Sequence, residues 1–94
     1  MLAKGKYPKL APGLRLVHPQ GTEQYFAYRP DTGVRYEANE VSFRMMEMMN
    51  GDNKVDVICS AIRQEFSGAD LVARDLETLL QQLVQEGCVI VEEK

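Results

Sequence analysis

The amino-acid sequence predicts an α+β fold: a winged-helix-like domain with an N-terminal three-stranded antiparallel sheet, three helices and a short C-terminal strand. Three observations predict it. The N-terminal part contains short segments in which apolar and polar residues alternate, separated by turn residues. Three segments with apolar residues at helical spacing follow, and a short apolar run closes the pattern. With 94 residues, of which 45% are hydrophobic, the chain is expected to fold as one domain over residues 1–94.

The N-terminal segment, residues 1–13, is expected to form an extended arm. Pro8 and Pro12 fix the backbone φ angle and supply no N–H donor. From Leu14 onward apolar and polar residues alternate as in a strand, and the turn sequence "HPQGTE" begins at His18. We therefore expect the first strand of the sheet to begin at Leu14 and to end near His18.

The other two strands of the sheet form a hairpin. The segment "QYFAYR" (24–29) is rich in the aromatic residues that strands favour, and "VRYEA" (34–38) alternates, with Val34, Tyr36 and Ala38 on one face. The loop between them, "RPDTGV", supplies a proline and a glycine for a tight turn. Because consecutive strands usually pair, the strand at 24–29 should lie in the middle and the strand at 34–38 at an edge.

A first helix follows this edge strand without a loop. Asn39 is a favourable N-cap, Glu40 suits the first turn, and Gly51 supplies a stop. Its apolar face is expected to contain Ser42, Phe43, Met45, Met46 and Met49.

Two more helices and a strand complete the pattern. The second helix should begin at Asn53 as N-cap, and the third should run over about 69–86, with Ser67 or Asp70 as its cap. The segment "CVIVEE" then reads as a short strand. The expected buried positions are Val55, Ile58, Cys59, Ile62 and Phe66 in the second helix, and Val72, Leu76, Leu79, Leu80, Leu83 and Val84 in the third.

The sequence contains no pattern that indicates catalysis, a metal or a cofactor. The methionines of "MMEMM" (45–49) are candidates for soft-metal ligation, but neighbouring residues on a helix point in different directions, so core packing is favoured. His18, the only histidine, has no identifiable nucleophile or substrate proton to serve. Cys59 and Cys88 lack a metal-binding spacing and are expected to be reduced core residues. We predict a protein that is not an enzyme.

The acidic residues of the third helix are better explained as a solvated face than as a metal site, because their spacing scatters them around the helix. Asp75 is the exception, since it borders the apolar positions Val72 and Leu79. A structural role there, as a cap or paired with a basic residue, and a functional role both stay open.

The expected location is the cytoplasm, with no membrane partner. No apolar run approaches the roughly 20 residues that span a bilayer. The opening "MLAKGKYPKL" has basic residues but no apolar stretch after them, so it does not resemble a signal peptide.

The distribution of charge argues against nucleic-acid binding, the first function that a winged helix suggests. Residues 1–37 hold six basic and three acidic residues, whereas residues 38–94 hold five basic and eleven acidic ones. The third helix, which would be the recognition helix, carries Arg74 against four acidic residues. Such a surface repels phosphates, so a DNA-binding protein is retained only as an alternative.

The edge strand at 34–38 favours a different function. Unpaired N–H and C=O groups at a sheet edge are a template for another chain, and an extended peptide can bind there as an added strand. The third helix should pack nearby, which makes a groove between edge and helix plausible. The strand is then a docking edge, and any chemistry belongs to a partner.

The sequence resembles the PqqD family, the small peptide-binding proteins of pyrroloquinoline quinone biosynthesis. It is similar also to the wider group of recognition elements for precursors of ribosomally synthesised and post-translationally modified peptides (RiPPs). The matching segments are "PKLAPGLRL" (8–16), "YEANEVSFRMMEMMNG" (36–51), "VDVICSAIRQEF" (55–66) and "VARDLETLLQQLVQEGCV" (72–89). Together they cover most of the chain.

This resemblance implies a non-catalytic peptide chaperone. It implies that the leader of a precursor peptide binds as an added strand beside the third strand, over the third helix, and is presented to a modifying enzyme, a radical SAM enzyme in the quinone pathway. The implied peptide-binding residues are Val34, Arg35, Tyr36 and Glu37 on the strand, and Leu71, Arg74, Asp75 and Thr78 on the helix. The basic N-terminal part suggests that the leader carries acidic residues near Arg29 or Arg35.

Two alternatives stay open at the level of sequence. The chain is also compatible with a structural subunit of a larger complex, which would differ from a peptide-binding module in not binding a short peptide alone. A homodimer is possible too, because an exposed edge and a proline-containing arm permit pairing between copies.

Overall fold

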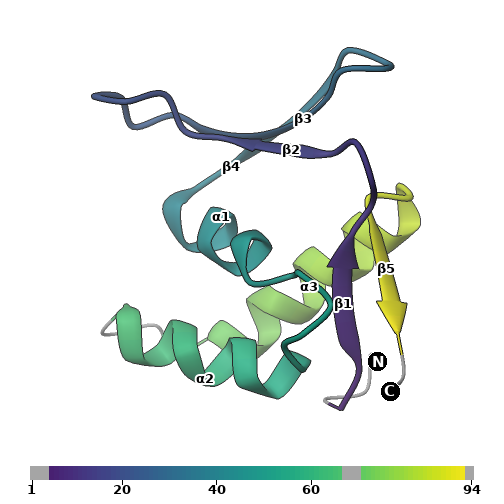
Figure 1. The fold of residues 1–94 in the computed structure, drawn as a ribbon. Helices are drawn as coiled ribbons and strands as arrows, with labels where there is room; N and C mark the ends of the chain where they lie inside the picture. The colour runs from purple at the N-terminus through teal and green to yellow at the C-terminus, as the bar shows by residue number, and fades with distance from the viewer. Residues whose placement is uncertain (1–4, 67–70, 93–94) are drawn as a thin grey trace.

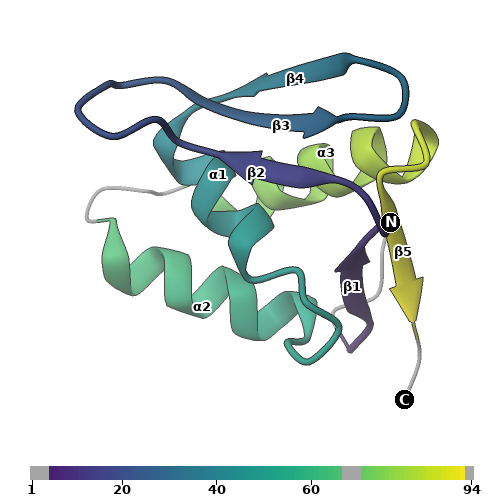
Figure 2. The same ribbon diagram turned by 45° about the horizontal axis from the view of Figure 1, so that its top comes forward.

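The protein forms a sheet that lies across a helical layer, with a separate two-stranded ribbon at one side. A computed structural model describes residues 5–66 and 71–92. The sheet of β2, β3 and β4 covers α1 and α3, and α2 packs on the other side of these helices (Figures 1 and 2). The elements are β1 (Tyr7–Leu10), β2 (Arg15–Val17), β3 (Tyr25–Arg29), β4 (Val34–Ala38), α1 (Glu40–Glu47), α2 (Val55–Glu65), α3 (Val72–Gln85) and β5 (Val89–Glu92). The expected α+β class, with this sheet, three helices and a C-terminal strand, is confirmed.

The three-stranded sheet is an antiparallel meander with β3 in the middle, as the sequence predicted. In its register, Arg15 of β2 and Arg35 of β4 both lie opposite Tyr28 of β3. Ala27 is fully buried because its small side chain meets the helices below the central strand. The β3–β4 turn closes through Gly33, whose backbone N–H donates to the Arg29 carbonyl at 2.7 Å. Both β2 and β4 are therefore edges.

Residues 7–10 were expected to lie in an extended arm, but they form the strand β1, which pairs antiparallel with β5. Pro8 is buried, and its carbonyl accepts a hydrogen bond from Gly51 N–H at 3.0 Å. Leu10 N–H donates to the Met49 carbonyl at 2.9 Å. The segment is extended, as its prolines require, but it is held by the end of the chain and by the loop after α1. The winged-helix expectation did not include this ribbon, which joins residues 7–10 to residues 89–92.

The first helix begins as predicted. The side chain of Asn39 caps α1 by accepting from the Ser42 N–H at 2.7 Å. The helix ends at Glu47, and Gly51, with a φ of 86°, makes the turn that follows. Only a glycine takes this conformation without strain, and a Cβ here would also meet the Lys9 side chain at 3.3 Å.

The predicted cap of the second helix is wrong. The helix begins at Val55, after Lys54, and no side chain caps it. Asn53 instead donates from its amide nitrogen to the Met48 carbonyl at 3.0 Å, closing the loop behind α1. The two predicted caps of the third helix, Ser67 and Asp70, lie outside the described residues.

The core lies between the sheet and the three helices. It contains most of the predicted positions, among them Met45, Met46 and Met49, which are nearly inaccessible to solvent. Cys59 and Cys88 are buried and free, as predicted. Val84 was expected to be buried, but it is 40% exposed. The buried stripe of α3 runs instead through Val72, Leu76, Leu80 and Leu83. No helix in the described ranges is long and apolar enough to cross a membrane.

Candidate functional site

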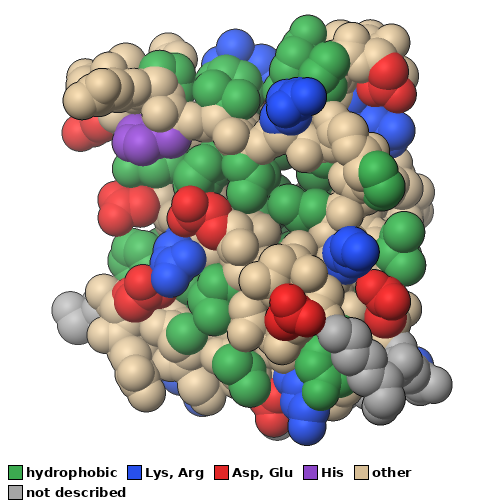
Figure 3. All heavy atoms as spheres, in the orientation of Figure 1, with side chains coloured by type: hydrophobic (Ala, Val, Ile, Leu, Met, Phe, Trp, Pro, Cys, Tyr) green, Lys and Arg blue, Asp and Glu red, His purple; other side chains and the backbone are tan. Residues whose placement is uncertain are grey.

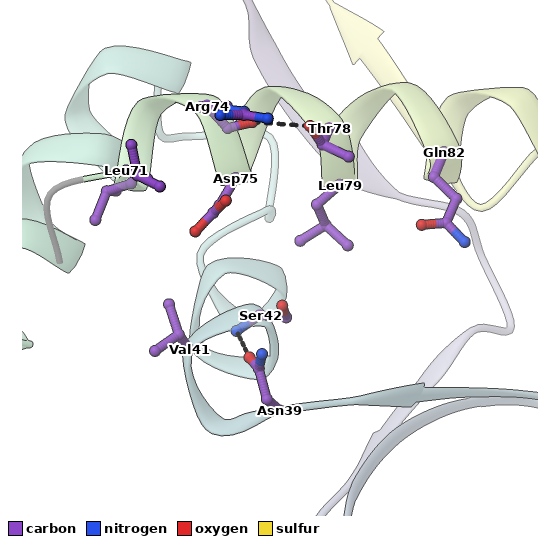
Figure 4. A pocket seen from close by; sticks show the side chains of 10 residues that line it. Asn39, Val41, Ser42, Leu71, Arg74, Asp75, Thr78, Leu79 and Gln82 are labelled. Atoms are coloured by element: carbon purple, nitrogen blue, oxygen red, sulfur yellow. Dashed lines mark hydrogen bonds between the residues drawn. The ribbon is translucent and has the colours of Figure 1, made fainter.

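A groove runs between α3 and the start of α1. It has a volume of about 740 Å³. The side chains of Asp75, Leu79 and Gln82 point from α3 toward Asn39, Val41 and Ser42 at the start of α1 (Figure 4). The lining residues are Asn39, Val41, Ser42, Leu71, Val72, Arg74, Asp75, Thr78, Leu79 and Gln82.

The groove continues along β4 into a smaller hollow of about 340 Å³. The two cavities share Asn39, Ser42, Leu79 and Gln82, so we treat them as one and call it the β4–α3 groove. The smaller hollow is lined by Tyr36, Glu37, Ala38, Asn39, Ser42, Met46, Leu79, Gln82, Leu83 and Glu86. The groove thus borders the edge strand on one side and α3 on the other.

Within residues 5–66 and 71–92, no strand pairs with the outer edge of β4 beside this groove. β4 pairs with β3 alone. In an antiparallel strand, alternate residues turn their N–H and C=O groups away from the partner strand. The outer side of β4 can therefore receive one more strand, which would lie along the groove.

Six of the eight residues that the family resemblance implied line the β4–α3 groove. Leu71, Arg74, Asp75 and Thr78 line the larger part, and Tyr36 and Glu37 line the smaller part. Val34 and Arg35 lie on β4 but line neither part. Leu71 is 57% exposed, so its apolar side chain is available at the mouth of the groove.

Arg35 is held on the outer face of the sheet. Its guanidinium carbon lies 3.7 Å above the centre of the Phe26 ring, and its Nε donates to Glu37 Oε1 at 2.8 Å. A cation over an aromatic ring is attracted by the negative face of the ring. A ligand charge that approaches Arg35 must therefore compete with these two neighbours.

Polar groups set the electrostatics within the groove. Asp75 is exposed and makes no ion pair with any described residue, so the pairing considered for it from the sequence is not seen. Thr78 donates from its hydroxyl to the Arg74 carbonyl at 3.0 Å. A hydrogen bond with the Cys88 thiol, and then burial, raise the pKa of the Tyr36 hydroxyl.

The sequence did not identify Asn39, Ser42, Leu79 and Gln82 as site residues. Asn39 was read only as a cap, and Leu79 only as a core residue. Helical spacing does carry a signal for Leu79 and Gln82, which follow Asp75 at intervals of four and three on one face of α3. Among the described residues, no group of three or more His, Cys, Asp or Glu side chains is placed to hold a metal ion.

Two comparisons with known proteins found a match, one to a family and one to a fold. The model of the family described as "Coenzyme PQQ synthesis protein D (PqqD)" matches residues 24–89. A solved structure described as "TbiB1 in Complex with the TbiA(beta) Leader Peptide" superposes with a TM-score of 0.69 at 21% sequence identity, covering 86% of this chain and 93% of that chain. Comparison with curated proteins found no match. The structural likeness establishes the fold, and the family match covers β3 to the start of β5.

Proposed function

The chain belongs to the PqqD family, and we propose that it binds the leader segment of a ribosomally made precursor peptide and presents it to a modifying enzyme. The leader adds to β4 as a further antiparallel or parallel strand and lies along the β4–α3 groove. Val34, Arg35, Tyr36 and Glu37 supply the edge, and Leu71, Arg74, Asp75 and Thr78 contact the leader from α3.

The observation that carries this proposal is the position of the open edge directly beside the groove. Strand addition gives backbone hydrogen bonds, which provide affinity for any sequence, whereas alternate side chains need pockets for specificity. At β4 both occur together, since Tyr36 and Glu37 belong to the edge and to the groove lining at once. The apolar side chains of Val41, Val72 and Leu79 line the larger part, so an apolar leader side chain finds an apolar surface there.

The structural neighbour adds support from outside the chain. TbiB1 is a protein of the same fold that was solved with a leader peptide bound. The shared fold makes leader binding the function to test first here, while the ligand of that protein remains a property of that protein.

In the proposed role the chain itself performs no chemistry and needs no cofactor. The modifying enzyme is a radical SAM enzyme if the pathway is that of pyrroloquinoline quinone, and another enzyme in a different RiPP pathway. The expected place of action is the cytoplasm. Because the edge also permits pairing between two copies, leader binding should compete with any homodimer formed through β4.

Backbone amide NMR tests strand addition directly. A synthetic candidate leader peptide is titrated into the labelled protein, and hydrogen exchange is followed at saturation. We expect shifts at residues 33–38 and along α3, with slower exchange at alternate amides of β4. Strand addition would be rejected if the amide chemical shifts of residues 33–38 did not change. It would also be rejected if the hydrogen-exchange rates of the β4 amides were the same in the bound state.

A further inference from the structure

A second hollow lies on the other side of α1 from the β4–α3 groove. It has a volume of about 470 Å³ and is lined by His18, Tyr25, Glu40, Phe43, Arg44, Glu47, Glu65 and Phe66. We call it the aromatic hollow. Figure 3 shows this side of the molecule, with His18 above a band of hydrophobic side chains and acidic side chains below that band. None of its lining residues belongs to the β4–α3 groove.

Three rings form the upper wall of the aromatic hollow. His18 stacks on Tyr25, with ring centres 4.1 Å apart and planes 5° from parallel. Phe43 of α1 tilts against Tyr25 at 5.2 Å. The His18 ring is fixed in place, because its Nδ1 lies 2.8 Å from the Gln24 carbonyl oxygen. The three rings thus form an ordered aromatic cluster that lines one part of the hollow.

The lower wall carries a net negative charge. Glu40, Glu47 and Glu65 contribute three carboxylates, against the single guanidinium of Arg44. Arg44 is already engaged with two of them: its Nε donates to both Glu65 carboxylate oxygens, at 3.0 and 3.1 Å, and its Nη1 lies 3.8 Å from Glu47 Oε1. Glu40 makes no ion pair with any described residue. One guanidinium thus serves two carboxylates while Glu40 has none, so the hollow keeps a net negative charge that favours a second cation.

Of these carboxylates, Glu40 acts on the Tyr25 ring. Burial raises the pKa of the Tyr25 hydroxyl, and the charges of Glu40 and Glu23 raise it further. A carboxylate raises the pKa of a phenol when it makes the local potential negative, because the phenolate is then disfavoured.

We propose that the aromatic hollow is a second interaction surface, which takes an arginine side chain from a segment of a protein partner while the β4–α3 groove is occupied independently. Planar guanidinium groups stack on aromatic rings and pair with carboxylates at the same time, whereas the compact lysine ammonium cannot lie flat on a ring. The hollow offers both kinds of contact among its lining residues. A nucleic acid would be repelled by the same carboxylates.

The arrangement on α1 lets both surfaces be filled together. The groove uses Val41, Ser42 and Met46 of α1, and the aromatic hollow uses Glu40, Phe43, Arg44 and Glu47. At 100° per residue these two sets point in opposite directions from the helix axis. A protein partner bound at the hollow would therefore leave the β4 edge open.

The test uses the full chain and a pair of blocked tripeptides, acetyl-Gly-Arg-Gly-amide and its citrulline analogue. Citrulline keeps the shape of arginine and removes its charge. In NMR titrations followed at aromatic and backbone resonances, we expect the arginine peptide to shift His18, Tyr25 and residues 40–47 at millimolar concentration, and the citrulline peptide to shift them several-fold less. Equal responses to both peptides, or shifts spread over all acidic surfaces, would overturn the proposal.

Variants separate the aromatic hollow from general acidity. The double change Glu40→Gln with Glu47→Gln removes two carboxylates without changing side-chain size, and we expect arginine-peptide affinity to fall about fivefold, since partly exposed charges each contribute modestly. Glu77→Gln is the matched control, because Glu77 lies on α3 and lines neither cavity. Glu47→Gln alone, at the end of α1, should show part of the loss if the double variant is unstable. An unchanged affinity in a folded double variant, or an equal loss with Glu77→Gln, refutes the assignment.

Discussion

The two edges of the three-stranded sheet differ in what lies beside them. β2 and β4 both pair with β3, and in the described ranges neither pairs with a further strand. β2 has three residues, and none of them lines the β4–α3 groove. β4 has five residues, and it borders a groove whose other wall is α3.

This difference explains why an open edge is not by itself a binding site. Backbone groups at both edges can accept a strand, but a three-residue edge that lines neither cavity holds any sequence weakly and selects none. At β4 the edge and the groove together can read alternate side chains. The groove, the end of the edge, its charge and its hydroxyl group should then each contribute to leader binding or to stability.

Filling the groove should have the largest effect. Gln82 is shared by both parts of the β4–α3 groove, and Gln82→Trp would place a large ring where the leader is proposed to lie. We expect leader affinity to fall at least about tenfold, equivalent to about 1.4 kcal/mol. Isothermal titration calorimetry with the leader peptide measures it.

The neighbouring residue is a matched control for this substitution. Gln81 is exposed on the same helix but lines neither part of the groove. Gln81→Trp should therefore leave leader affinity unchanged while adding the same ring to α3. If both variants bind the leader as the unaltered protein does, the ligand does not use the groove, and the distinction between the two edges fails.

The next largest effect is expected at the junction between β4 and α1. Asn39 caps α1 through the Ser42 N–H at 2.7 Å, and removing an N-cap side chain costs about 1 kcal/mol. Asn39→Ala should lower the free energy of unfolding by about that amount in chemical denaturation. Asn39→Asp keeps a cap and should restore most of the stability. Equal stability of the alanine variant and the unaltered protein would show that the cap does not fix the end of the edge strand.

A smaller effect is expected from charge at the edge. Arg35→Glu should weaken binding of an acidic leader at low salt by about threefold, a limited loss because Arg35 is exposed and already paired with Glu37. Arg15→Glu is the control from the other edge, since Arg15 and Arg35 both lie opposite Tyr28. An equal loss in both variants would indicate long-range attraction, and no loss in either would remove the acidic leader from the proposal.

The sequence was sufficient to predict the edge strand but not the surface beside it. Alternation at 34–38 and the Asn39 cap are local signals, and both are confirmed. The pairing of β1 with β5 joins segments about eighty residues apart, and no local pattern encodes a contact at that separation. The proline-containing segment therefore appeared to be a free arm.

One wall of the groove was predictable from local spacing, and the other was not. Leu71, Arg74, Asp75 and Thr78 follow the spacing of one helix face, so a family pattern could assign them together. The opposite wall depends on how far α1 stands from α3, which packing decides. Asn39 and Ser42 consequently enter the site only when the two helices are placed in space, although Asn39 is visible in the sequence as a capping residue.

Ionisation of Tyr36 should give the smallest effect. It should first be visible as a loss of folding stability at alkaline pH. Its pKa lies above the ordinary value of 10.0 because of the hydrogen bond with Cys88 and of burial. The folded state then holds this proton more tightly than the unfolded state, so the stability it contributes is complete below pH 10.0 and is lost as the pH rises through the folded-state pKa. Tyr36→Phe should make this alkaline loss, followed by circular dichroism, less steep.

Leader binding at β4 should raise the pKa of Tyr36 further and should leave the pKa of the other tyrosines unchanged. A strand laid along β4 would exclude water from Tyr36, which disfavours the phenolate and raises its pKa further. By linkage, leader affinity should be constant below pH about 10 and should fall above it, and Tyr36→Phe should remove the fall. Tyr25 also has a raised pKa, but it lies in the aromatic hollow across α1, so its titration should not respond to the leader. Tyrosinate absorbance of Tyr36→Phe and Tyr25→Phe, with and without leader, separates the two groups. A leader that shifts Tyr25 and leaves Tyr36 unchanged would place the peptide on the wrong side of α1 and overturn the assignment to β4.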